Sequence, residues 1–360
     1  MTDNVTDNSK VSSVEIGQRV TKTPDNPYGF NIVKTVPIDQ PVILSMGGTG
    51  STNKFPSVAN GYLSRLEQWL NANGIKEGVG FYGVMYNFAS HHDLCSRKLL
   101  FQQHHRNPTK RVETYDEETL NPAYVEDVFQ KAFLGRISDE KGQRLSVDEA
   151  VSRMRKLTVF AHCHGAYTFL KVEEKMQNKM RELGYSPTER ARIQKELVCV
   201  AHAPHAPLGV SKSTMISFAS GSDPEIPHYN NFTKELISMP VASWRNSYFP
   251  EERGEVIIAP TLGDEAEQHN FIPNDPALNP RGRSLYRLEG ATLAHATQRY
   301  LSNSSKPKTP LEIICGQRDD IKKYMDVLKR KGEELWDRLR TSAQKRRQTQ
   351  RQAQNPNGGR

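Results

Sequence analysis

Short apolar runs alternate along the chain with longer segments in which apolar residues recur at helical spacing. The runs are rich in β-branched and aromatic residues, which predicts strands, and the segments between them predict helices. The expected strands cover residues 41–46, 79–88, 157–162, 196–201, 215–219 and 255–259. Strands that alternate with helices predict an α/β fold, and continuous apolar runs predict strands that are covered on both faces. We therefore expect a three-layer sandwich with a mostly parallel central sheet.

Polar segments mark the two ends of this domain and one interruption in it. Residues 1–27 are rich in Thr, Asp, Asn and Ser, so we expect a disordered N-terminal segment. The α/β domain then extends over residues 28–318, with a polar insertion at about 89–145. Residues 319–360 begin with the spacing of an amphipathic helix and end in a polar sequence that has no means of forming a core. The prediction is one domain followed by a helical and disordered tail.

The positive charge of the chain lies in this tail. The net charge is +8, and residues 321–360 hold 12 Lys or Arg against 4 Asp or Glu, which accounts for all of it. A basic tail is typical of contact with an anionic partner such as nucleic acid. It also resembles the export signals of bacterial type IV secretion substrates, which implies contact with secretion machinery. The charge therefore characterises the tail and says little about the α/β domain.

Cysteine usage and hydropathy bear on the compartment. No apolar run reaches the ~18 residues of a membrane span, and the N-terminus lacks the basic and apolar regions of a Sec-type signal. The four cysteines (Cys95, Cys163, Cys199 and Cys315) are far apart, which argues against a disulfide framework and against a cysteine-rich zinc site. We therefore expect a cytoplasmic protein, or one exported without a Sec signal, that has no transmembrane segment.

The stretch Leu157–Leu170, LTVFAHCHGAYTFL, carries the strongest chemical signal. Its β-forming run ends abruptly, and a helical pattern begins at once, so Cys163 lies at a sharp turn between a strand and a helix. The small residues Ala161 and Gly165 flank this turn, as in a nucleophile elbow. A thiol attacks as the thiolate, and the N-terminus of a helix favours that anion. Cys163 is therefore the candidate nucleophile.

This A-x-C-x-G pattern, in its strand–turn–helix context, resembles the α/β-hydrolase fold superfamily, and the resemblance covers about residues 38–305. A cysteine replaces the usual serine, as in the dienelactone-hydrolase branch. The superfamily has the order nucleophile, acid, histidine, each at the end of a strand. The resemblance implies a triad of Cys163, Asp223 and His269, in which His269 accepts the thiol proton and Asp223 orients it. Asp264 is an alternative acid, and His295 an alternative base.

The resemblance also implies an oxyanion hole. Its backbone N–H donors come from the residue after the nucleophile and from the loop after the first core strand, which are His164 and Gly48 here. Glycine at the second position lets the backbone approach a carbonyl oxygen closely.

Two histidines flank the candidate nucleophile. Because side chains alternate along a strand, His162 and His164 are expected to share one face and to point away from Cys163. The spacing HxH, with His202 and His205, raises the alternative of a metal site. A metal requires three or four converging ligands, and no carboxylate stands at a familiar spacing such as HExxH. We predict no metal and no cofactor, and we keep His162 as an alternative catalytic residue.

These features favour a hydrolase that cleaves an ester, thioester or lactone of a small-molecule or acyl substrate through a Cys163 acyl-enzyme. A second hypothesis is a non-catalytic α/β-hydrolase-fold binding module. A third is a secreted bacterial effector whose basic tail serves export or binds an anionic polymer.

Overall fold

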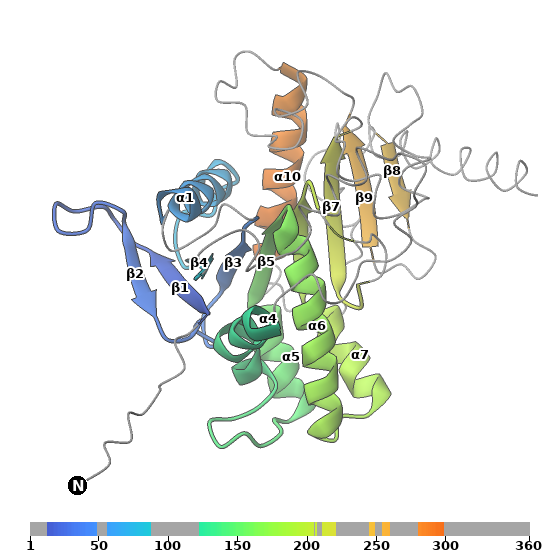
Figure 1. Cartoon of the computed structure of the whole chain (residues 1–360). Helices are drawn as coiled ribbons and strands as arrows, with labels where there is room; N and C mark the ends of the chain where they lie inside the picture. Colours follow the sequence, from blue (N-terminus) through green and yellow to red (C-terminus); the bar gives the residue numbers. More distant parts are fainter. Residues whose placement is uncertain are drawn as a thin grey trace, which may run out of the picture.

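The computed structural model describes residues 13–48, 56–87, 122–204, 206, 211–220, 245–248, 254–259 and 280–298. These residues form a nine-stranded sheet of order β2-β1-β4-β3-β5-β6-β7-β9-β8 (Figure 1). The strands are β1 (Val14–Arg19), β2 (Phe30–Val33), β3 (Val42–Met46), β4 (Gly80–Tyr86), β5 (Leu157–His162), β6 (Val198–His202), β7 (Thr214–Ser220), β8 (Arg245–Tyr248) and β9 (Gly254–Ala259). All six apolar runs that the sequence marks are strands.

The sheet is parallel through its centre and antiparallel at its two edges. From β4 across β3, β5, β6 and β7 to β9, every neighbouring pair is parallel. At one edge β1 is antiparallel to both β2 and β4, and at the other β8 is antiparallel to β9. The predicted mostly parallel sheet is confirmed. Its central strands β3, β5 and β6 are buried along their whole length, which explains their unbroken apolar sequences.

Two helices cover one face of the sheet. They are α1 (Pro56–Ala72) and α10 (Pro280–Gln298), which contact each other. Phe160 of β5 packs edge-on against Trp69 of α1, with ring centroids 5.9 Å apart. The rest of this apolar layer includes Ile43, Leu63, Leu66, Val200, Phe218 and Leu293.

A larger group of helices covers the opposite face (Figure 1). It comprises α4 (Pro122–Val128), the π-helical turn η2 (Phe129–Phe133), the 3₁₀ turn η3 (Leu134–Arg136), α5 (Val147–Arg155), α6 (His164–Glu182) and α7 (Pro187–Lys195). α6 lies over the centre of the sheet, where Phe169, Val172 and Met176 are fully buried. The predicted three-layer α/β sandwich is confirmed for the described residues.

One part of the predicted domain plan differs from the structure. Residues 1–27 were expected to be disordered, but Val14–Arg19 forms β1, whose Val14 and Ile16 are fully buried. The partly polar sequence of β1 gives no continuous apolar run, because only part of the strand faces the core. Within the expected insertion at about 89–145, Phe129 and Phe133 belong to the main core.

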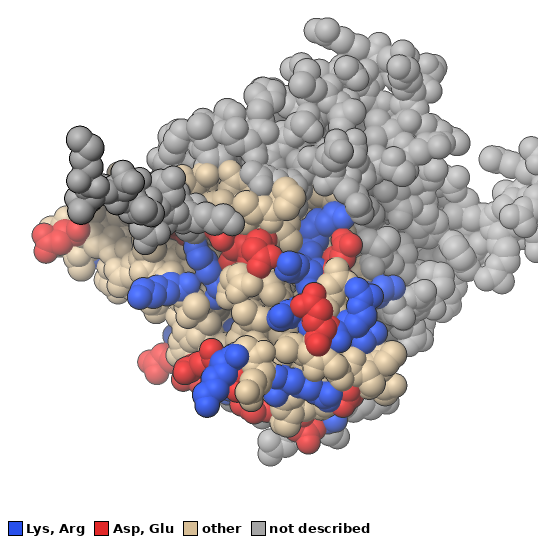
Figure 2. All heavy atoms as spheres, turned by 60° about the horizontal axis from the view of Figure 1, so that its bottom comes forward, with Lys and Arg blue, Asp and Glu red and all other residues tan. Residues whose placement is uncertain are grey.

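The described surface mixes both signs of charge. On the face shown in Figure 2, Lys and Arg side chains alternate with Asp and Glu. Several of them form ion pairs between neighbouring helices and loops, including Arg144–Glu189 and Arg192–Asp148. This pattern agrees with the assignment of the net charge to residues 321–360, which lie outside the described residues together with the predicted tail helix. No helix in the described part of the chain is long and apolar enough to span a membrane.

Candidate active site

Cys163 occupies the sharp turn that the sequence predicts between β5 and α6. Its backbone has φ 53° and ψ −125°, a conformation that non-glycine residues rarely adopt. The turn is possible because Gly165 presses against the end of β3: a Cβ at Gly165 would lie 1.9 Å from the carbonyl oxygen of Met46. Cys163 therefore lies in a strained turn between a strand and a helix, as the sequence predicts.

The backbone around Cys163 fixes the thiol at the carboxyl end of the sheet. The Cys163 N–H donates to the carbonyl oxygen of His202 on β6, at 3.1 Å, and the Cys163 carbonyl accepts from Ala166 N–H, also at 3.1 Å. Cys163 precedes the first residue of the 19-residue helix α6, whose N-terminal dipole favours an anion there. Its side chain remains 8% exposed.

Gly48, a predicted oxyanion donor, lies directly against the thiol. β3 and β5 are parallel with Met46 opposite Ala161, and Gly48 and Cys163 each come two residues after this pair. A Cβ at Gly48 would be 2.9 Å from the Cys163 Cβ and 3.3 Å from its Sγ. Only glycine fits there without a shift of the thiol. His164, the other predicted donor, is the first residue of α6.

The acid and base predicted from the hydrolase resemblance are not among the residues that the structure describes. Asp223, His269 and the alternative acid Asp264 lie outside the described residues, as does His205 from the metal alternative. The alternative base His295 lies in the last turn of α10 and is half-buried. The Asp223–His269 pair thus remains a prediction.

The two histidines beside Cys163 do not share a face, contrary to the expectation. His162 lies on the α1 and α10 side, where it contacts Tyr62 and His202. The His164 ring instead contacts Tyr167 of α6, with centroids 5.7 Å apart. Strand alternation ends at Cys163, because its positive φ turns the chain and His164 already belongs to the helix. A Cβ built on Gly48 would lie 3.7 Å from His162 Nδ1 and 3.3 Å from Cys163 Sγ, so both side chains face Gly48.

His162 belongs to a buried polar group that we call the histidine cluster, made of Tyr62, His162, His202 and Glu289. The Tyr62 hydroxyl is hydrogen-bonded to His162 Nδ1 at 2.8 Å. The rings of His162 and His202 have centroids 5.3 Å apart. His202 Nδ1 lies 3.0 Å from both carboxyl oxygens of Glu289. The cluster connects α1, β5, β6 and α10 at the end of the sheet that carries Cys163.

The histidine cluster is largely shielded from solvent. His162, His202 and Glu289 are 4%, 3% and 0% exposed. Burial raises the pKa of Tyr62 far above its ordinary value, and the neighbouring Cys163 thiol raises it further. Tyr62 therefore keeps its proton over the whole physiological range.

Sequence reasoning missed Tyr62 and Glu289, and it considered His202 only as a metal ligand. One signal was available: the runs VFAH and VCVAH both end in Ala-His, and the two histidines are in register on adjacent strands. Tyr62 and Glu289 have no comparable sequence signal, because only the packing of α1 and α10 on the sheet brings them to the strand ends. In the described part of the chain, no group of three or more His, Cys, Asp or Glu side chains is arranged to hold a metal ion.

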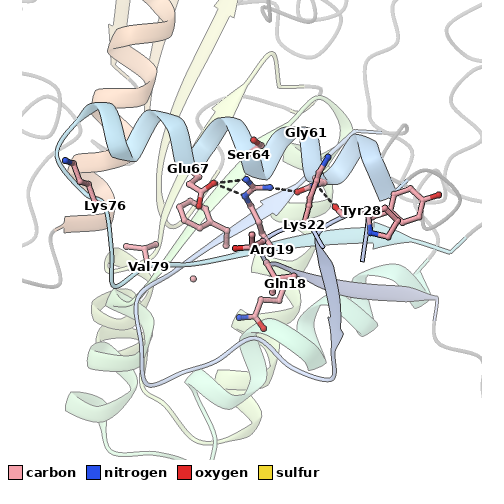
Figure 3. A pocket seen from close by; sticks show the side chains of 15 residues that line it. Gln18, Arg19, Lys22, Tyr28, Gly61, Ser64, Glu67, Lys76 and Val79 are labelled. Carbon is pink, nitrogen blue, oxygen red and sulfur yellow. Dashed lines mark hydrogen bonds and ion pairs between the residues drawn. The ribbon is translucent and has the colours of Figure 1, made fainter. Parts of the chain in front are cut away.

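A separate cavity of about 650 Å³ lies between α1 and the β1–β2 hairpin (Figure 3). Its lining is mainly polar, and Arg19 crosses it to bind Glu67 at 2.8 Å and Asn60 at 2.6 Å. Cys163 is not among its lining residues. Because its central cation is already paired, this cavity is a weaker candidate for chemistry than the elbow.

Neither a protein-family model nor a curated protein matches the sequence. Solved structures that are similar to the chain include two esterases. The esterase LipW from Mycobacterium marinum is 12% identical, with a TM-score of 0.36, over 79% of this chain and 83% of that protein. EstE1, a thermostable carboxylesterase cloned from a metagenomic library, is 12% identical, with a TM-score of 0.37, over 80% of this chain and 90% of that protein. With TM-scores this low, neither activity is transferred to this chain.

Proposed function

We propose that this protein is an α/β-hydrolase-type enzyme that cleaves an ester, thioester or lactone through an acyl-enzyme on Cys163. The observation that carries the proposal is the strained backbone of Cys163 between β5 and α6, with Gly48 packed against the thiol. Backbone strain of this kind is concentrated at functional sites. A buried, inert cysteine at a strand end would need neither the positive φ nor a glycine pressed against its sulfur.

The proposed reaction follows from these positions. The Cys163 thiolate attacks the substrate carbonyl carbon, and the carbonyl oxygen becomes an oxyanion. Backbone N–H groups of Gly48 and His164 stabilise that oxyanion. The leaving group departs with a proton, and water then hydrolyses the thioester on Cys163. In this proposal His269 moves the protons and Asp223 orients it.

The test is a Cys163→Ala variant assayed against a panel of activated esters, thioesters and lactones. Removal of a nucleophile should lower kcat by at least about 10³-fold. Cys199→Ala is the matched control, because Cys199 is a fully buried cysteine on the neighbouring strand β6 and should be dispensable for turnover. Hydrolysis that survives Cys163→Ala but disappears on heat denaturation would place the activity elsewhere and reject the proposal.

A further inference from the structure

The histidine cluster has no role in the reaction proposed above, yet it lies near Cys163. Both lie next to Gly48: a Cβ built on this glycine would be 3.3 Å from Cys163 Sγ and 3.7 Å from His162 Nδ1. The Tyr62 hydroxyl is 2.8 Å from that same nitrogen. Tyr62 is half-buried, whereas the three other members are buried. Its hydroxyl is thus the member of the cluster placed to meet a molecule bound at Cys163.

The properties of Tyr62 fit a hydrogen-bond donor rather than a base. Its pKa is raised by burial, so it keeps its proton. A hydroxyl has one hydrogen to donate and two lone pairs that accept. In the tautomer in which His162 Nδ1 carries a hydrogen, that N–H donates to the Tyr62 oxygen. The hydrogen of the Tyr62 hydroxyl is then available to donate to a different acceptor. The buried pair His202–Glu289 packs beside the His162 ring and holds its orientation.

We propose that Tyr62 is a further catalytic residue, whose hydroxyl donates a hydrogen bond to the oxyanion formed on the substrate carbonyl, and that His162 positions it. The inference rests on the proposed acyl-enzyme reaction. It adds a side-chain donor from α1 to the backbone donors at Gly48 and His164. The site would therefore favour substrates whose carbonyl oxygen becomes fully anionic, as in acyl transfer.

The step involves no proton transfer from Tyr62. The sulfur electron pair forms the S–C bond, and the carbonyl π pair moves to oxygen. The oxyanion accepts the Tyr62 O–H while the proton stays on Tyr62, and the His162 Nδ1–H donates to the Tyr62 oxygen. When the tetrahedral intermediate collapses, the pair returns to re-form C=O, the bond to the leaving group breaks, and Tyr62 is unchanged.

The first experiment compares Tyr62→Phe with Tyr86→Phe in the full chain. Tyr86 is a matched control: it is also a tyrosine near Cys163, but it lies on the opposite face of the sheet, and its hydroxyl donates to Thr168 Oγ1 at 3.3 Å. Loss of one oxyanion donor should lower kcat by about 10²-fold with KM little changed. Tyr86→Phe should retain kcat. Thermal unfolding of both variants shows that each is folded.

Alkylation of Cys163 by iodoacetamide distinguishes an effect of Tyr62 on the oxyanion from an effect on the thiol. Alkylation requires the thiolate but forms no oxyanion, so Tyr62→Phe should leave its rate unchanged while kcat falls. If Tyr62→Phe lowers the alkylation rate and kcat by the same factor, Tyr62 acts on the thiol, and the inference is overturned. A retained kcat in Tyr62→Phe, when Cys163→Ala abolishes turnover, would overturn this inference alone. Activity that survives Cys163→Ala would reject the proposed function and this inference with it.

The positioning role of His162 is tested by a double-mutant cycle. His162→Phe keeps a ring in place but removes the nitrogen that binds Tyr62. If His162 acts through Tyr62, the double variant Tyr62→Phe/His162→Phe should be no slower than Tyr62→Phe alone. Losses in kcat that multiply would show that the two residues act independently and would contradict this part of the inference.

Discussion

Cys163 and Cys199 belong to neighbouring strands of the sheet but have very different surroundings. Cys163 is at the N-terminus of α6 with its side chain 8% exposed. Cys199 is in the middle of β6 and is fully buried, and burial, followed by the nearby Glu173 carboxylate, raises the pKa of its thiol well above the usual value. The two thiols therefore differ in their access to solvent and in their local electrostatics.

This contrast predicts selective labelling of the native protein. At neutral pH iodoacetamide should modify Cys163 and leave Cys199 intact, because alkylation requires both access and thiolate. Mass spectrometry of the labelled peptides measures both sites in one sample. Labelling in denaturant, where both cysteines should react, is the control. Equal labelling of the two sites in the folded protein would contradict the prediction and weaken the assignment of Cys163 as nucleophile.

Local sequence patterns predicted the turn at Cys163 and the glycine beside it, since both follow directly from the ends of apolar runs. Tyr62 and Glu289 could not be predicted in this way. Each comes from a helix, and which helical residue reaches the strand ends depends on how α1 and α10 pack on the sheet. Position along the chain therefore identified Cys163 and Gly48, but not the side chains that surround them.

At the level of elements, the strands that are buried on both faces were the easiest to predict. β3, β5 and β6 have no polar alternation and were found close to their true bounds. β1 was missed because its burial alternates only in part, and α7 was missed because it buries only Ile193 and Gln194. α7 does carry a local signal: Ser186 and Glu189 form a capping box with Pro187 as the first helical residue.

The contact between α6 and β3 predicts a specific sensitivity at Gly165. A Cβ there would lie 1.9 Å from the Met46 carbonyl oxygen, a backbone atom that cannot move away cheaply. Gly165→Ala should therefore lower the free energy of unfolding by about 3 kcal/mol or more, as measured by urea denaturation. It should also disturb Gly48 and with it the proposed oxyanion hole.

Gly61→Ala is the matched control for that substitution. Gly61 also lies in a helix, α1, but a Cβ there would meet nothing within 4 Å. Because alanine favours the helix over glycine, this variant should be stabilised by about 0.5–1 kcal/mol. If Gly165→Ala were as stable as Gly61→Ala, the close approach of α6 to β3 would be wrong.

At the scale of the whole molecule, the excess positive charge and the candidate active site belong to different parts of the chain. The described α/β domain has a surface of mixed sign, as Figure 2 shows for one face. The candidate active site lies at the carboxyl end of the parallel strands, where ligands of open α/β sheets bind. The excess positive charge belongs to residues 321–360. A contact with an anionic partner should therefore depend on the tail and be independent of Cys163.

This separation predicts that deleting residues 341–360 weakens binding to duplex DNA without changing hydrolysis. The deleted segment carries five Lys or Arg and no Asp or Glu. Each phosphate contact releases counterions, so the logarithm of the binding constant falls linearly with the logarithm of salt concentration. Fluorescence anisotropy at several salt concentrations should give a slope smaller by up to about 4 for the shortened chain. Cys163→Ala should bind DNA like the intact protein, and an unchanged slope after the deletion would exclude the tail as the anion-binding element.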